Sequence, residues 1–498
     1  METVYDIVII GSGLGGLECA TILSKHGYRV CVLEKNPKLG GTLHGFKRYG
    51  CEFGTGMHYI GSLDEGQVTH TLFKYLGILD KINIKKMDAT GFDQFSIGGK
   101  EYKYAMGKEA FIELLSSYFP YESAEIAQYF REIETAAKQV DVYNLRPLKD
   151  FDIRTNHALN TSAFEKIRSI THNRQLQNVM GALNFVHAGE KEKTPFYTHA
   201  LINKYYIDSA YKLVDGSYQI ATSLAENINN AGGDVFKSQK VSEFISENGK
   251  ITAVKTEQGK TVYGKQFISN IHPSLTIRML DNSLLRKPYR MRITNLENTI
   301  SAFTLHLKLK DNSFPYLNYN YHYFKKDDAW YPSYYSEKNW PEFYYLFVPA
   351  KSDSDSYANC ISIHTYMKFA EVEKWKDLPI RKRGDDYEDW KASKAEKLIQ
   401  LVSEKFPELR GNIEAYNVST PLSLRDYIGT PDGGMYGISM DYKNPMRTYV
   451  APRTKIPNLF FTGQNVSLHG MLGVSMSSLI TCGEFLGINN LIKDINEK

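Results

Sequence analysis

The fold is decided by the stretch Asp6-Ile7-Val8-Ile9-Ile10-Gly11-Ser12-Gly13-Leu14-Gly15-Gly16 near the start of the chain. Its first part, Asp6–Ile10, is a β-branched run typical of a parallel strand that is buried on both faces. After the glycines, a helical stretch continues to about His26 and ends at the next glycine. A second apolar run, Val30–Leu33, then ends at Glu34. This order predicts a strand, a tight turn, a helix and a second strand.

The glycine spacing within this unit predicts a dinucleotide site. Gly11 permits the tight turn, Gly13 lets backbone N–H groups approach a pyrophosphate, and Gly16 allows close packing of helix on strand. The phosphates then lie at the positive end of the helix, and Glu34 can accept hydrogen bonds from both ribose hydroxyls. A bare Gly-x-Gly-x-x-Gly match is weak, but its position between a strand and a helix makes this one specific.

The fingerprint alone does not separate NAD from FAD, because both carry the same pyrophosphate and ribose. Six residues past Glu34, Gly40-Gly41-Thr42 adds a second glycine pair. This pair resembles the extra pyrophosphate contact of large FAD-binding oxidoreductases. We therefore expect FAD as the cofactor.

Several longer motifs resemble one superfamily over nearly the whole chain. At the N-terminal end these are Leu33–Pro37, Leu39–Gly41 and Phe53–Gly61, and toward the C-terminal end they are Ser269–Pro273, Thr462–Asn465 and Gly470–Ser475. Phe196–Ala200, Val214–Ala221, Ser423–Tyr427 and Gly429–Pro431 match in order between them. Together they resemble the phytoene desaturase, carotenoid isomerase and retinol saturase superfamily of FAD-dependent oxidoreductases. One departure is Gly54, which stands where members commonly have aspartate.

The resemblance implies a set of cofactor contacts. Around the ADP part it places Gly11, Ser12, Gly13, Leu14, Gly15, Gly16, Glu34, Lys35, Gly41 and Thr42. Val241 is expected beside the adenine through its backbone, and Gly463 and Gln464 beside the ribityl chain. Gly473 and Val474 are expected near the isoalloxazine, where a helix N-terminus stabilises negative charge on the reduced ring.

Catalytic groups are harder to choose, because flavin chemistry needs chiefly a hydride path and one proton donor or acceptor. His58, His199, Asp426 and Tyr427 lie in motifs that resemble those of the family. For each of the four, a structural hydrogen-bonding role is an equally good interpretation. No histidine or cysteine pattern has metal-ligand spacing, so we expect no metal.

The predicted fold class is α/β, with a glutathione-reductase-like Rossmann domain interleaved with a mixed-sheet substrate domain and a helical region. The FAD-binding domain is expected in three pieces, 1–70, 212–275 and 450–498. Residues 71–211 read as mainly amphipathic helices on the substrate or membrane side, and residues 276–449 as the substrate-binding domain. Aromatic residues crowd the segment Phe314–Phe347, as a plain half-buried sheet or as the wall of a long apolar ligand site.

Composition limits the possible partners and location. The net charge of +4 over 498 residues gives nucleic-acid binding no support. With no long apolar run and no signal-like start, we expect a location in the cytoplasm or peripherally on a membrane. The basic cluster Arg286–Arg292 is either a solvated turn or a membrane contact. The five scattered cysteines read as reduced, mostly buried thiols.

These features favour an FAD-dependent enzyme that saturates, desaturates or isomerises double bonds of a hydrophobic polyene or isoprenoid lipid. An amine oxidase or another lipid-modifying flavin dehydrogenase is the alternative. A non-catalytic prenyl-binding protein of the Rab escort type is a more remote one, since it has no need of the intact glycine turn with Glu34. No second dinucleotide fingerprint follows a strand, so the electron donor or acceptor is expected to be external.

Overall fold

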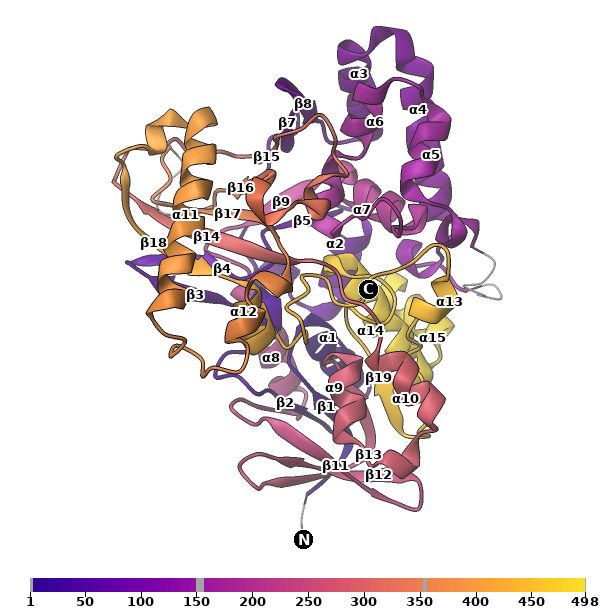
Figure 1. The fold of residues 1–498 in the computed structure, drawn as a ribbon. Helices are drawn as coiled ribbons and strands as arrows, with labels where there is room; N and C mark the ends of the chain where they lie inside the picture. Colours follow the sequence, from indigo (N-terminus) through magenta and orange to yellow (C-terminus); the bar gives the residue numbers. More distant parts are fainter. Residues whose placement is uncertain (1–2, 149–155, 353–355, 498) are drawn as a thin grey trace.

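Two seven-stranded sheets form the framework of the computed structural model, which describes residues 3–148, 156–352 and 356–497 (Figure 1). One sheet carries the N-terminal unit and the other lies beside it toward the helical end of the molecule. The predicted class, an α/β fold with a Rossmann-type domain and a mixed-sheet second domain, is confirmed.

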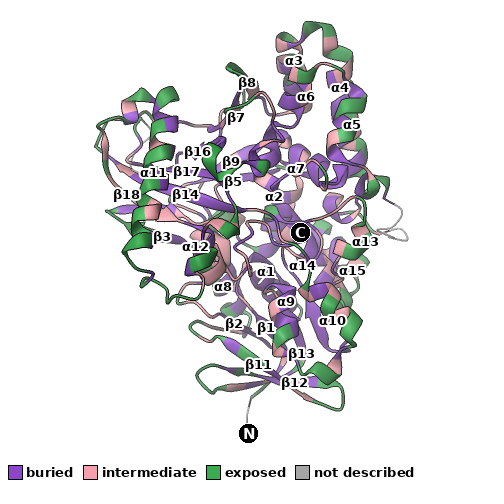
Figure 2. Ribbon diagram, viewed as in Figure 1, coloured by how far each residue is buried: buried purple, intermediate pink, exposed green. Residues whose placement is uncertain are grey.

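The first sheet is built around the predicted N-terminal strand. Its strand order is β10 (Asp234–Phe236), β2 (Val30–Leu33), β1 (Val4–Ile10), β13 (Thr261–Ser269), β12 (Lys250–Thr256) and β11 (Val241–Glu247). β1 pairs in parallel with both β2 and β13. The side chains of Ile7, Val8 and Ile9 are fully buried, because helices or loops cover both faces of this central strand (Figure 2).

The last part of the chain completes this sheet. β19 (Leu459–Phe461) pairs in parallel with the end of β13, so that Phe461 lies opposite Ser269. α14 (Gly470–Leu486) then packs against α1 (Leu14–Lys25), and α8 (Tyr218–Asn230) lies on the other side of α1. Segments from both ends of the chain therefore meet at the carboxyl edge of the sheet.

The second sheet is mainly antiparallel. Its order is β18 (Ile413–Ser419), β14 (Ser301–Leu309), β17 (Cys360–Met367), β16 (Phe343–Phe347), β15 (Asn320–Phe324), β7 (Asp93–Ile97) and β8 (Lys100–Tyr104). Only β15 and β7 pair in parallel. β16 and β17 are buried along their whole length, so this part of the sheet is covered on both faces.

The segment 71–211, predicted as mainly helical, also contains three strands. β7 and β8 join the second sheet through a turn at Gly98-Gly99, and β6 (Ile84–Lys86) pairs with β9 (Ala210–Leu213). The helices of this part are α2 (Val68–Leu76), α3 (Lys108–Tyr118), α4 (Ser123–Lys138), α5 (Ala163–Ile170), α6 (Arg174–Met180) and α7 (Phe196–Asp208). The division into three domains remains a prediction.

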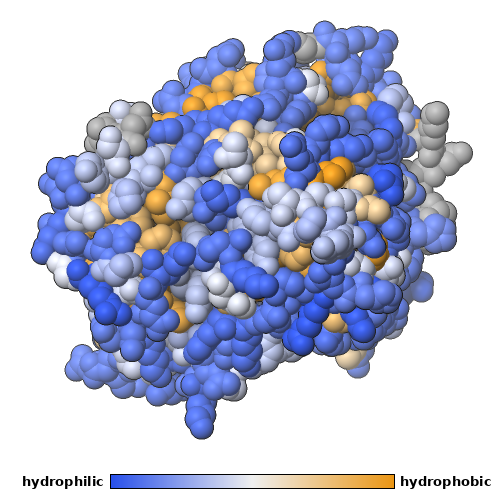
Figure 3. Space-filling view, turned by 90° about the horizontal axis from the view of Figure 1, so that it is seen from above, coloured by the Kyte–Doolittle hydropathy of each residue, from blue (hydrophilic) through white to orange (hydrophobic). Residues whose placement is uncertain are grey.

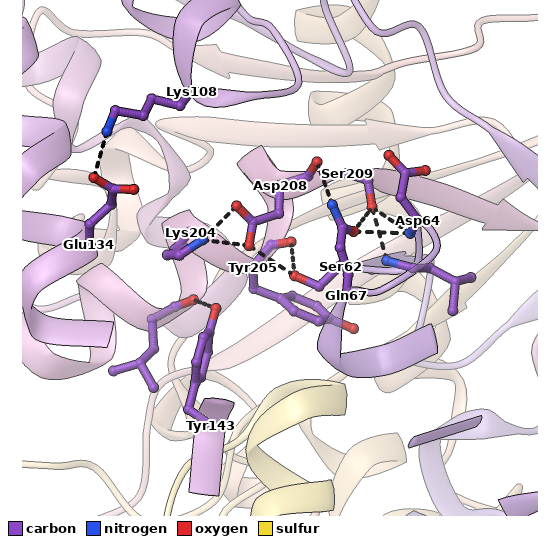
Figure 4. Close-up of polar contacts among 12 residues, drawn as sticks. Ser62, Asp64, Gln67, Lys108, Glu134, Tyr143, Lys204, Tyr205, Asp208 and Ser209 are labelled. Atoms are coloured by element: carbon purple, nitrogen blue, oxygen red, sulfur yellow. Dashed lines mark hydrogen bonds and ion pairs between the residues drawn. The ribbon is translucent and has the colours of Figure 1, made fainter. Parts of the chain in front are cut away.

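A polar network fixes the end of α7 to the N-terminal unit (Figure 4). Lys204 forms an ion pair with Asp208 one turn later, with the Nζ and Oδ1 atoms 2.7 Å apart. The Ser209 hydroxyl donates to Gln67 Oε1 at 2.6 Å and accepts from the backbone N–H of Leu63. These bonds hold the connection between β5 (Tyr59–Gly61) and α2, and so they fix the strand that follows His58.

The remaining elements cover the two sheets. They are the hairpin β3 (Gly45–Arg48) and β4 (Cys51–Gly54), with α9 (Pro273–Met279), α10 (Lys287–Thr294), α11 (Asp385–Lys405), α12 (Pro421–Ser423), α13 (Pro445–Thr448) and α15 (Ile488–Glu497). All five cysteines are buried free thiols. Within the described ranges, no single helix is long and apolar enough to cross a membrane. The bent pair α14–α15 passes that test by length and composition only.

Candidate functional site

A cavity of about 330 Å³, here called the ADP cavity, lies where β1, β2 and β13 end and α1 begins. The N-cap of α1 is Gly13, so the free N–H groups of the first turn face this space. Gly11 has a φ of +93°, a conformation that favours glycine. The expected site for an anion at a helix N-terminus is therefore present.

Asn270, at the end of β13, explains why glycine occurs so often here. A Cβ on Gly13 or Gly15 would lie 2.8 Å from the Asn270 side chain, and one on Gly463 would lie 2.3 Å from it. The amide of Asn270 thus holds the turn after β1 and the segment after β19 close together. Sequence reasoning named Ser269–Pro273 as a motif but missed Asn270 as a lining residue, although the motif itself was the signal.

Twelve of the fifteen predicted cofactor residues line the ADP cavity: Gly11, Gly13, Leu14, Gly15, Glu34, Lys35, Gly41, Thr42, Val241, Gly463, Gln464 and Val474. Ser12 lies behind it, and its N–H and hydroxyl both donate to Glu34 Oε2, at 3.0 and 2.7 Å. Gly16 and Gly473 lie in tight packing, because a Cβ on Gly16 would be 2.2 Å from the Gly11 carbonyl oxygen and one on Gly473 2.5 Å from that of Leu468.

Glu34 is buried and held in a fixed position. Besides the two bonds from Ser12, its Oε1 accepts from the backbone N–H of Asn36 at 2.8 Å. The carboxylate keeps lone pairs for further donors, since each of its oxygens accepts more than one hydrogen bond. The arrangement suits recognition of a ribose diol from the ADP cavity.

A second cavity of about 150 Å³, the ring cavity, shares Leu14, Thr42, Gln464 and Val474 with the ADP cavity. It lies between the start of α14 and the second sheet. α14 starts at Gly470, so Gly473 and Val474 lie within its first two turns. None of the described residues that line the ring cavity is an aspartate, glutamate, lysine or arginine.

Neutral imidazole and phenol groups dominate the wall of the ring cavity. His58 and His364 lie side by side, with their ring centroids 4.4 Å apart, and Tyr345 is the cross-strand partner of His364. The atoms His58 Nδ1, His364 Nε2 and the Tyr345 hydroxyl are buried and have no hydrogen-bond partner within the described residues. Buried polar atoms of this kind are usually satisfied by a ligand or water.

Burial sets the charge of these groups. It lowers the pKa of His58 to about 4, and it holds the pKa of His364 well below its usual range, helped by the neighbouring His58. Burial raises the pKa of the Tyr345 hydroxyl well above its usual range. All three side chains are therefore uncharged at neutral pH, and the ring cavity can hold an apolar molecule beside groups that can hydrogen-bond or hold a proton.

The four predicted catalytic residues lie in different places. His58 lines the ring cavity, and Tyr427 lies in a π-helical turn, Leu424–Ile428, beside the ADP cavity. His199 is buried in α7 with its Nε2 2.7 Å from the Tyr129 hydroxyl. Asp426 forms ion pairs with Arg383 and Arg425. The structure thus brings His58 to the ring cavity and gives His199 and Asp426 internal partners.

Known proteins resemble this chain in sequence and in fold. The family model for "Flavin containing amine oxidoreductase" matches residues 14–349. The all-trans-retinol 13,14-reductase of Rattus norvegicus is 29% identical over 98% of this chain and 87% of its own length. The chloroplastic prolycopene isomerase of Arabidopsis thaliana is 25% identical over 88% of this chain and 74% of its own length.

A solved structure of putrescine oxidase bound to putrescine shares the fold, with a TM-score of 0.66, 14% identity and full coverage of both chains. The predicted superfamily resemblance is confirmed, and so are the predictions of an oxidoreductase and of FAD as its cofactor. The ADP cavity, with its glycine turn and Glu34, fits that cofactor. The chain therefore belongs to the flavin containing amine oxidoreductase family.

Proposed function

We propose that this enzyme acts on carbon–carbon double bonds of a polyene or isoprenoid lipid, by saturation, desaturation or cis–trans isomerisation. The observation that carries the proposal is the uncharged aromatic wall of the ring cavity, directly beside the cavity that fits the ADP part of FAD. The names of the retinol reductase and prolycopene isomerase relatives support this substrate class.

Residues of the ADP cavity would bind the cofactor, and residues of the ring cavity would bind the substrate and hold the proton. Gly11–Gly15, Glu34, Gly41 and Thr42 would hold the ADP part, and Gln464 and Val474 would lie where the two cavities join. Bound FAD supplies hydride transfer at its N5 atom. The aromatic side chains would orient the polyene and exclude water, and His58 Nδ1 would hold the proton that leaves or reaches the neighbouring carbon.

Amine oxidation is the alternative that the family name keeps open. Anaerobic absorbance at the flavin band separates the two functions. The chemically reduced enzyme is mixed with all-trans-retinol or a carotenoid, and the oxidised enzyme with putrescine. Each polyene is also mixed with the oxidised enzyme. We expect a polyene to reoxidise the reduced flavin and lose a double bond, to reduce the oxidised flavin and gain one, or to isomerise without a redox change, which chromatography of the polyene detects. Reduction of the flavin by putrescine, with no change in any polyene, would contradict the proposal.

We propose that electrons come from or go to a separate partner. FAD itself would fill the ADP cavity, and a nicotinamide that only collides with the flavin lacks the geometry that can lower a barrier by roughly 7 to 11 kcal/mol in the best cases. NADPH should therefore reduce the flavin slowly and without saturation in stopped-flow absorbance. Saturable bleaching within the turnover time would show a nicotinamide site.

We also propose reversible contact with a membrane surface through α10, because an apolar substrate must leave a bilayer to reach the ring cavity. This helix and its N-cap present Arg286 and Lys287, and the Met291 side chain is half exposed. Figure 3 looks down on the end of the molecule that carries α3–α5, away from α10, and that face is mostly hydrophilic with several hydrophobic patches. Liposome flotation should show binding that falls with salt. No association with any lipid mixture would count against it.

A further inference from the structure

A third cavity of about 660 Å³, here called the cationic cleft, adjoins the ring cavity. The two share Thr55, Ala302, Thr304 and Leu424 in their walls. The cleft differs from the ring cavity in charge. Its wall carries the cations Lys47, Arg48, Arg381, Arg383 and Lys391, and Glu388 is the one carboxylate among the described residues that line it.

Two of these cations are already neutralised. Arg383 is buried and forms an ion pair with Asp426, and it also donates to the backbone carbonyl of Trp375. Lys391 forms an ion pair with Glu388, with Nζ and Oε2 2.7 Å apart. Both cations are therefore held by carboxylates and are not free to turn toward a ligand.

The other three cations carry uncompensated charge. Lys47, Arg48 and Arg381 are exposed residues, and within the described part of the chain no carboxylate lies within 4.0 Å of their charged atoms. Each long side chain can therefore turn toward a ligand without first breaking an ion pair. Three like charges around one hollow attract anions, and the low-dielectric wall strengthens the field.

Local structure brings these residues together from distant parts of the sequence. Lys47 and Arg48 lie on β3, whose hairpin is held by Phe46 packing edge-on against the buried ring of His306. Arg381 lies in a turn closed by the Lys382 N–H on the Pro379 carbonyl, and its φ of +66° is unusual for a residue with a side chain. In Figure 1 the hairpin, β18 and α12 lie on the same side of the molecule.

We propose that the cationic cleft binds the anionic end, a carboxylate or a phosphate, of an amphipathic polyene or isoprenoid whose apolar chain lies in the ring cavity. This assignment rests on the proposed function. The uncharged ring cavity gives an anion no compensation, whereas the adjoining cleft offers three free cations. The substrate would thus be oriented by its charged end, with a chosen double bond at the flavin.

The test compares two polyenes that differ only at the end of the chain. All-trans-retinoate and all-trans-retinol are titrated into the FAD-loaded protein at low salt, with flavin fluorescence as the readout. We expect retinoate to bind at least about tenfold more tightly than retinol, which corresponds to about 1.4 kcal/mol. The preference should shrink as salt is added.

The variant Lys47→Gln/Arg48→Gln/Arg381→Gln should bring the two affinities to within about twofold and leave retinol binding unchanged. The matched control Lys237→Gln/Lys250→Gln/Lys255→Gln removes the same charge from exposed positions around the far hairpin of the first sheet and should keep the preference. Equal affinities in the wild-type protein, or a preference that survives in the cleft variant, would overturn the assignment.

A third arm uses NADPH, whose phosphates share the same chemistry. Saturable NADPH binding that only the cleft variant loses, with retinoate binding unaffected, would reassign the cleft to a dinucleotide. The readout is binding, so it is independent of turnover. Turnover of retinol by an enzyme with no preference for retinoate would refute the cleft assignment and leave the proposed function standing. A clear preference for retinoate without turnover of any polyene would refute the proposed function and leave the cleft as a site for anionic ligands.

Discussion

The ADP cavity and the ring cavity share four residues but are built from different material. The ADP cavity presents backbone N–H groups, glycines and the carboxylate of Glu34, and its fingerprint residues lie within the first 42 residues. The start of β11, the end of β13 with α9, the turn 427–430 and the C-terminal segment complete its wall. The ring cavity presents neutral side chains such as His58, Tyr345 and His364. The contrast supports the proposal that the first cavity binds the ADP part of FAD and that the reaction takes place in the second. Substitutions in the first should change affinity for FAD, and those in the second should change rate.

The largest expected effect is in the glycine turn. Gly11→Val should weaken FAD binding by more than about 100-fold, because a β-branched residue at φ +93° is strained and its Cβ would lie 2.9 Å from Ile271 Cγ2. The ratio of flavin to protein absorbance measures the loss. Gly27→Val is the control, since Gly27 has a φ of +83° with open space around it. Equal FAD loss in both variants would show that strain alone is responsible.

His58→Asn should lower kcat by about 100-fold and leave FAD bound, because the side chain lies in the ring cavity with a free Nδ1 atom. His199→Asn is the matched comparison. It should lower Tm by several degrees and keep most of the rate per bound flavin, since it breaks the contact with Tyr129 away from the cavities. A larger loss of kcat in the His199 variant than in the His58 variant would contradict the catalytic role of His58.

Glu34→Gln should weaken FAD binding by about tenfold to 100-fold, because a charge-assisted hydrogen bond to a ribose hydroxyl is worth roughly 1 to 3 kcal/mol. Isothermal titration of the apoprotein with FAD measures the change. The exposed Glu247→Gln, at the end of β11, is the control and should bind FAD normally. Full FAD occupancy of the Glu34 variant after dialysis would mean that this carboxylate does not hold the ribose.

The smallest effect should come from the packing of α1 against α14. Glu18, on α1, is fully buried against α14, where it accepts from the Ser475 hydroxyl at 2.7 Å. Burial raises its pKa to about 7, an effect that outweighs the hydrogen bond from Ser475. The folded state therefore favours the protonated acid. Its contribution to stability is fully present below about pH 4.5 and is lost as pH rises to about 7.

The corresponding free energy is at most about 3 kcal/mol for a shift of this size. Glu18→Gln should therefore make the apoprotein about 1–2 kcal/mol more stable than wild type at pH 8 and no more stable at pH 4.5. Urea unfolding at both values measures this. A variant that is less stable than wild type at pH 8 would contradict the protonated state.

The ADP cavity could be predicted because its signals are local. The strand, turn and helix from Asp6 to His26 lie within one short segment, and the second strand ends at Glu34, so spacing alone fixes their roles. Asn248-Gly249, with positive φ at both residues, likewise forms the hairpin turn between β11 and β12, as expected of an Asn-Gly pair between two strands. In each case the physical constraint acts between near neighbours in the chain.

The ring cavity could not be predicted in the same way. His58, Tyr345 and His364 come from different parts of the chain and meet only because β16 and β17 pair beside the segment before β5. The strand β7 was missed for a related reason, since its partner β15 lies more than 200 residues later. The Gly98-Gly99 turn was the local signal for it.

The start of α14 shows how one close contact overrides a local rule. Gly473 lies within the first turn of α14, although glycine disfavours a helix, and it is glycine because the carbonyl of Leu468 approaches too closely for a Cβ. Among the four predicted catalytic residues, the motifs did not separate His58 from His199. Both belong to family-like segments, and only the tertiary structure shows which one faces a cavity.

The pairing of β19 with β13 has a consequence for the order of assembly. The FAD site needs Gly11 from the first strand–helix turn and Gly463 and Val474 from the last, more than 440 residues later. When only the N-terminal unit has left the ribosome, the glycine turn after β1 is present without the segment from β19 to α14 that completes the site. Closing so long a loop is slow, although its entropic penalty grows only with the logarithm of length. Stable capture of the cofactor should therefore follow release of the C-terminal segment, and retention of FAD reports that both ends of the chain have met.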